Sequence, residues 1–134
     1  MPKGLPAPDD RGLDVTHTWG RTYWGGALFC LLADIQIRER THNRYGLRDA
    51  LRGVLAAGGS IEKDWPITRI FAVADKAVGV PVAAELYGQM RAKPLAVDLP
   101  ALWRRLGVAV RDDTVHFDDQ APLAAIRAAI TGDP

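Results

Sequence analysis

The feature that most constrains the fold is an apolar run near the start of the chain, ALFCLLA at residues 27–33, within the longer segment 22–41. Its large apolar residues recur at helical spacing: Trp24, Leu28, Leu31 and Ile35. Neighbouring apolar positions widen this stripe until the helix is apolar almost all round. Such a helix needs partners on several sides, so we expect residues 22–41 to form a central, buried helix. Cys30, the only cysteine, is expected to be a small buried side chain.

The rest of the chain predicts shorter helices separated by glycine and proline signals. Asp64 and Pro66 form a helix start, Gly79 ends that helix, and Asp98 is expected to cap another. We expect these further helices at residues 47–57, 66–78, 82–91, 98–106 and 122–130. The stretch VAVRDDTVHF alternates on both sides of Asp112 and Asp113, which indicates a hairpin. The sequence therefore predicts a mainly α fold, a bundle of about five to six helices with one small β-hairpin near the C-terminus.

Length and composition favour one ordinary domain. A chain of 134 residues suits a single core, and a net charge of +1 does not favour nucleic acid or an anionic membrane as a partner. Residues 1–18 carry three prolines and no periodicity, so we expect an extended arm there and a helical domain over residues 19–134. The first residues lack the apolar core of a signal peptide, and the apolar run is too short for a membrane span. We therefore expect a cytoplasmic protein.

Spacing alone assembles no catalytic set. None of the three histidines belongs to an HExxH motif, and the single E-x-x-H, Glu39 and His42, lies on a charged helix end. His116 alternates outward in the expected hairpin. Phosphate-binding loops and the G-x-S-x-G elbow are also absent from the sequence. We expect no metal ligands and no cofactor-binding residues in this chain itself.

Three stretches nevertheless carry a resemblance to a known family. They are YWGGALFCLLADIQIRERT at residues 23–41, GLRDALRGVL at 46–55, and LAVDLPALWRRLGVAVRDDTVHFDDQAPLAAIRAAI at 95–130. Together they resemble the C-terminal helical region of zinc aminopeptidases of the glycyl-aminopeptidase type, within the gluzincin group. The similarity spans roughly residue 14 to the C-terminus.

The resemblance implies a catalytic role for Tyr23. In the family, the tyrosine before the glycine donates its phenolic O–H to the oxyanion of the tetrahedral intermediate, which suits a neutral donor at the edge of a closed site. It also implies zinc in the full-length parent, a catalytic zinc domain as partner, and a peptide substrate. This sequence departs from the pattern at Gly25, where the family often has Lys or Arg, and it lacks HExxH and the downstream Glu. We therefore expect that this chain alone does not hydrolyse peptides.

A second hypothesis comes from a different class of protein. The same chain could be a stand-alone, non-catalytic helical module that binds a protein partner or itself. Trp19, Tyr23 and Trp24 cluster near the expected arm, and an aromatic patch of this kind would favour self-association. Tyr23 would then be a packing or contact residue.

Overall fold

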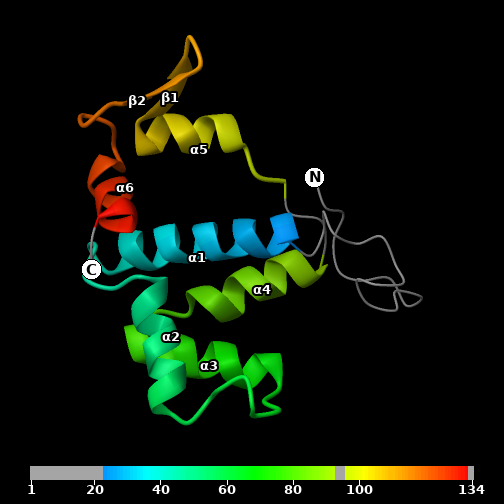
Figure 1. Ribbon diagram of the computed structural model, residues 1–134. Coiled ribbons are helices and arrows are strands. Elements are labelled where there is room, and N and C mark those ends of the chain that lie inside the picture. Colours follow the sequence, from blue (N-terminus) through cyan, green and yellow to red (C-terminus); the bar gives the residue numbers. More distant parts are fainter. Residues whose placement is uncertain (1–22, 93–95, 133–134) are drawn as a thin grey trace.

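The computed structural model describes residues 23–92 and 96–132 (Figure 1). Within these ranges the chain forms six helices and one two-stranded hairpin: α1 (Gly25–Arg40), α2 (Leu47–Ala56), α3 (Ile67–Val78), α4 (Val82–Ala92), α5 (Leu99–Leu106), β1 (Val108–Arg111), β2 (Thr114–Phe117) and α6 (Ala124–Thr131). The mainly α fold with a hairpin near the C-terminus is confirmed. The expected arm at residues 1–18, and Trp19 with it, lie outside the described residues.

Local capping signals explain several of the helix ends. Asp98 caps α5 as expected, because its Oδ1 accepts the backbone N–H of Ala101 at 2.9 Å. Gly79 ends α3 in the left-handed region, with φ of 76°. The place of the start signal formed by Asp64 and Pro66 is confirmed, since α3 begins directly after Pro66, although no side chain caps that end. Proline suits this position because the first N–H groups of a helix have no partner within it.

The hairpin turns at Asp112 and Asp113, whose φ values of 49° and 58° both lie in the left-handed region. Two consecutive positive φ values match the right-handed twist of the flanking strands. Val108 pairs with Phe117 and Val110 with Val115, so these side chains share one face of the hairpin. Val110, Val115 and Phe117 are exposed, so the described residues leave most of this apolar face uncovered.

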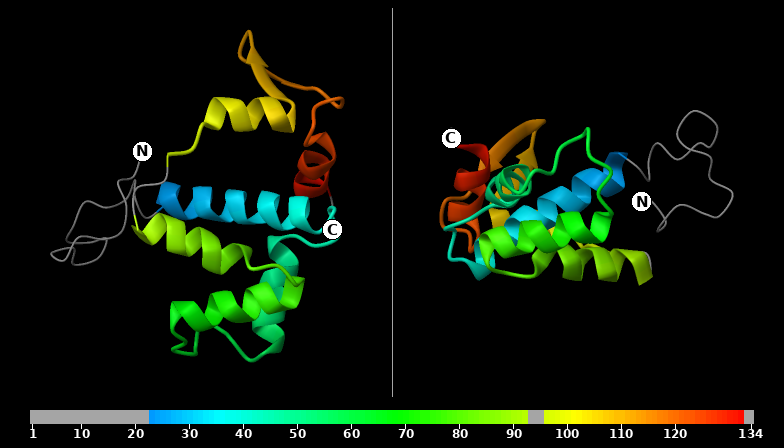
Figure 2. Two further views of the ribbon diagram at one scale, coloured as in Figure 1. Left: turned by 180° about the vertical axis from the view of Figure 1, so that it is seen from behind. Right: turned by 90° about the horizontal axis from the view of Figure 1, so that it is seen from below.

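Helix α1 lies between two hydrophobic clusters, and it contributes to both. Ala33 and Ile37 belong to a cluster shared with α2, α3 and α4, whereas Ile35 belongs to a cluster shared with α5 and α6. In Figures 1 and 2, α1 accordingly crosses the middle of the molecule, with α4 along one side and α5 and α6 on the other. The expectation of a central helix is confirmed for the second half of α1.

The first half of α1 differs from the expectation. Trp24 is 73% exposed, and Cys30 is exposed rather than buried. Two residues of this half are partly buried. Phe29 packs against the cluster shared with α2, α3 and α4, and Leu31 packs against the cluster shared with α5 and α6. No described element covers Trp24 or Cys30.

The burial of α2 and the backbone of the turn after α1 follow the local sequence signals only in part. Ala50 and Val54 of α2 are buried, whereas Leu51 and Leu55, which helical spacing places on the same side, are 51% and 63% exposed. After α1, His42 and Asn43 adopt the left-handed conformation, whereas Gly46 does not. The reason for glycine there is space, since a Cβ on Gly46 would lie 2.6 Å from side-chain atoms of α1.

No helix in the described part of the chain is both long and apolar enough to cross a bilayer.

Candidate functional site

Tyr23, the candidate catalytic residue, lies immediately before the first turn of α1. Its side chain is 57% exposed, and the next residue, Trp24, is exposed still further. A Cβ added at Gly26 would meet nothing within 4 Å in the described part of the chain. No described element therefore packs closely against the backbone at Gly26. The start of α1 is therefore a surface that presents an aromatic pair, one of which is a phenol.

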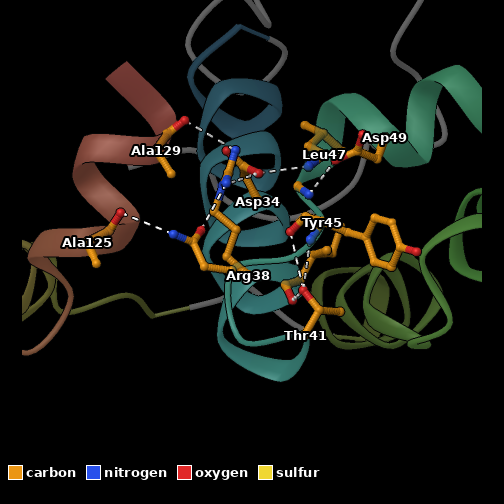
Figure 3. Close-up of polar contacts among 11 residues, drawn as sticks. Asp34, Arg38, Thr41, Tyr45, Leu47, Asp49, Ala125 and Ala129 are labelled. Carbon is orange, nitrogen blue, oxygen red and sulfur yellow. Dashed lines mark hydrogen bonds and ion pairs between the residues drawn. The ribbon is translucent and has the colours of Figure 1, made fainter. Parts of the chain in front are cut away.

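The opposite end of α1 is held by a network of polar contacts that joins three helices (Figure 3). Asp34 Oδ1 accepts the backbone N–H of Leu47 at 2.7 Å and Arg38 Nε at 3.1 Å. These contacts tie the start of α2 to α1. Both charged side chains are largely buried, with 16% of Asp34 and 15% of Arg38 exposed. We call Asp34, Arg38 and Asn43 the α1 hub.

The α1 hub also reaches α6. Arg38 Nη1 donates to Asn43 Oδ1 at 3.0 Å, and Arg38 Nη2 lies 3.4 Å from the carbonyl oxygen of Ala129. The Asn43 amide donates to the carbonyl of Ala125 at 3.3 Å. Together these contacts hold α1, the helix that follows Tyr23, against both α2 and α6.

Part of the run that carries the family resemblance has a structural role here. Asp34 and Arg38 of the hub belong to ADIQIRERT, as does Thr41. Thr41 Oγ1 donates to the carbonyl of Ile37 at 2.8 Å and accepts the N–H of Tyr45 at 3.2 Å, which closes the turn after α1. Sequence spacing indicated only an Asp–Arg pair on one helix face, and the contacts to α2 and α6 could not be seen from it.

The other residues considered for chemistry do not form a site. Glu39 of the E-x-x-H pairs with Arg105 of α5, and His42 is exposed. His116 is exposed as expected, whereas His17 lies outside the described residues. Among residues 23–92 and 96–132, no three His, Cys, Asp or Glu side chains gather closely enough to hold a metal ion.

Two hollows lined by residues that the structure describes lie elsewhere on the surface, and Tyr23 lines neither of them. One, of about 370 Å³, lies where α2, the following loop and α3 meet, and its wall is apolar. The other, of about 600 Å³, lies at the base of the hairpin and includes Arg104, Arg111 and His116. Sequence reasoning missed both, because each combines residues from three separate segments.

No family model, curated protein or solved structure matches this chain. The support for a function is therefore the placement of Tyr23, together with the residues that resemble the peptidase region.

Proposed function

We propose that this chain is the C-terminal helical domain of a zinc-dependent aminopeptidase of the gluzincin group, and that it forms one wall of the substrate cleft. The observation that carries the proposal is the position of Tyr23. This residue precedes the central helix α1, and more than half of it is exposed. A tyrosine used only to fill the core would be largely buried. The α1 hub and both hydrophobic clusters hold the helix behind it.

In this proposal the chain contributes a hydrogen-bond donor and a binding surface. In the parent enzyme, zinc would supply Lewis-acid chemistry at the scissile carbonyl and at the attacking water, and its ligands would come from another segment. Tyr23 donates its phenolic O–H to the oxygen on which negative charge develops. This donor accelerates the reaction because its hydrogen bond is stronger in the transition state than to the neutral carbonyl. The zinc ligands and the general base belong to an HExxH segment that this sequence does not contain.

The surface beside Tyr23 fits a contact with a catalytic domain. Trp24 exposes a large apolar ring at the same end of α1. An aromatic side chain that is exposed in one domain and next to a functional residue is suited to burial against a second domain. The zinc domain of the parent enzyme is the partner that this arrangement favours.

A substitution of Tyr23 tests the proposed catalytic role. In the full enzyme we expect Tyr23→Phe to lower kcat on the order of 10²-fold, the usual effect of removing one oxyanion donor. KM should change little, because the ring remains. Tyr87→Phe is the matched control. The ring centroids of Tyr87 and Phe71 lie 5.1 Å apart with the rings tilted, and this contact would survive the loss of the hydroxyl. A Tyr23→Phe enzyme with a kcat within twofold of wild type would contradict the catalytic assignment.

Reading the DNA upstream of the Met1 codon, in frame, tests for the parent enzyme itself. The proposal expects an open frame that encodes HExxH and a later Glu. A stop codon with a ribosome-binding site directly before Met1 would contradict it, because the zinc site would then have no source in the same polypeptide.

The second candidate is a stand-alone interaction module. The exposed Tyr23 and Trp24 favour this reading too, because they would form its contact surface. Size-exclusion chromatography across concentrations tests self-association through this face. An oligomer that Trp24→Ala dissociates would support the module, whereas a monomer at every concentration would contradict self-association.

A further inference from the structure

Helix α2 exposes an amphipathic face on the side away from the core. Arg48, Leu51, Arg52 and Leu55 follow the i, i+3, i+4, i+7 spacing of one helix face, and all four are exposed. The opposite face holds the buried Ala50 and Val54. The exposed leucines are one helical turn apart, so they form a short apolar ridge between two arginines.

The ridge borders the hollow of about 370 Å³, which we call the α2–α3 groove. Val54, Trp65 and Ile70 form its apolar wall. Ile61, which also lines it, has a fully exposed side chain. The volume lies in the range of about 300–1,000 Å³ typical of binding pockets, and such pockets are mostly apolar. A groove of this shape beside a leucine ridge suits the apolar side of a helix.

Several cationic side chains lie around the α2–α3 groove. Lys63 lines it, and the guanidinium of Arg69 lies 3.8 Å from the centre of the Trp65 ring. Within the described part of the chain, no acidic side chain forms an ion pair with Arg48 or Arg52.

Four acidic residues also lie in this region. Asp49 accepts the N–H of Gly46 at 2.9 Å, and Asp75 accepts the N–H groups of Ala83 and Ala84. Both carboxylates therefore serve the backbone at helix starts. Glu62 and Asp64 are exposed acidic side chains in the loop between α2 and α3, on either side of Lys63. The part of the rim that attracts negative charge is therefore the exposed face of α2, which carries Arg48 and Arg52.

We propose that the α2–α3 groove binds an amphipathic helix of another protein, whose apolar side chains enter the groove and whose acidic residues face Arg48 and Arg52. A second copy of this chain is the alternative occupant, because in a two-fold contact the arginines of one copy can face Glu62 and Asp64 of the other. The variants below distinguish the two occupants. This surface involves neither Tyr23 nor the start of α1, so the inference stands apart from the peptidase proposal.

The test uses the 134-residue chain and two synthetic helical peptides. Both carry leucines at i, i+3 and i+7, with glutamates flanking the leucines in one and lysines in the other. We expect the glutamate peptide to shift the methyl NMR signals of Leu51, Leu55 and Ile61 saturably. It should bind at least about tenfold more tightly than the lysine peptide, because the exposed face of α2 is cationic. Equal affinities, or shifts spread over the hairpin and the start of α1, would overturn the proposal.

Two variants with matched controls make the test specific. Leu55→Glu should abolish binding of the glutamate peptide, and Arg52→Glu should reverse the preference between the peptides. Both side chains are exposed, so the fold should persist, which far-UV circular dichroism checks. The hairpin variants Val110→Glu and Arg111→Glu make the same kinds of change at exposed positions away from the groove and should leave binding unaltered. A dimer that Leu55→Glu dissociates would make a second copy the occupant and would also overturn the proposal.

Discussion

Gly107 occupies the point where α5, the hairpin and the start of α6 meet. Its φ of 69° lies in the left-handed region, and a Cβ would lie 2.2 Å from the carbonyl oxygen of Asp118. The chain after β2 returns to this point, since the N–H of Asp118 donates to the carbonyl of Gly107 at 2.8 Å. Arg127 of α6 donates to the carbonyls of Gly107 and Asp118. Only glycine satisfies both the backbone conformation and the close approach.

Gly107→Ala should therefore destabilise the protein more than the same change at a simple helix end. The left-handed backbone alone costs a non-glycine residue about 1–2 kcal/mol, and the clash with Asp118 adds to that cost. Gly79→Ala is the matched control, because Gly79 is also left-handed but a Cβ there would meet nothing within 4 Å. Urea denaturation followed by circular dichroism would compare them, and equal losses of unfolding free energy would contradict the role of the close approach.

At the scale of elements, one buried carboxylate joins α3 to α4. Asp75, in the last turn of α3, is only 9% exposed. Its Oδ1 accepts the N–H of Ala83 at 2.7 Å and its Oδ2 the N–H of Ala84 at 3.0 Å. These donors have no partner within α4, because they belong to its first turn. Asp75 thus caps the next helix from the end of the preceding one, and its negative charge also suits that end of the helix dipole.

Asp75→Ala should cost about 2–4 kcal/mol of unfolding free energy, because it leaves two helix N–H groups unsatisfied near the core. Asp98→Ala is the control for an exposed cap and should cost only about 1 kcal/mol. Chemical denaturation of the two variants would measure the difference. A loss at Asp75 no larger than that at Asp98 would contradict a special role for the buried cap.

At the scale of the whole molecule, α1 connects two groups of elements that share few other contacts. Its residues contribute to the cluster with α2–α4 and to the cluster with α5 and α6. The α1 hub adds polar contacts from α1 to α2 and α6 (Figure 3). Folding of both groups should therefore depend on this one helix.

Asp34→Ala should destabilise the protein by about 2–4 kcal/mol, because it removes the partner of a mostly buried arginine and the acceptor of a helix N–H. Hydrogen exchange should show reduced protection in both α2 and α6. Glu85→Ala is the control, since it breaks the exposed ion pair with Arg40, and such a pair contributes about 0–1 kcal/mol. Loss of protection in α2 alone would contradict the link between the two groups.

Most of the helices and the hairpin could be predicted from the sequence because their signals are local. Asp98 and Gly79 act within one turn of the helices that they bound, and Asp112 and Asp113 bend the chain between two alternating segments. The central place of α1 followed from apolar residues on all its sides. Tyr23 was singled out through the family resemblance, and its exposure could not have been read from the helical spacing.

The remaining features depend on contacts between distant segments. Helical spacing predicts the same burial for Leu51 and Leu55 as for Val54, yet only Val54 is buried. It also predicts that Cys30 is buried with its apolar neighbours, yet Cys30 is exposed. Periodicity defines which residues share a face but not how many elements pack on it. The sequence by itself thus determined the elements, the caps that lie next to them in the chain, and the helix that had to be central. The tertiary structure decided which apolar faces were covered, because six helices of this length cannot enclose every apolar side chain of a chain this small.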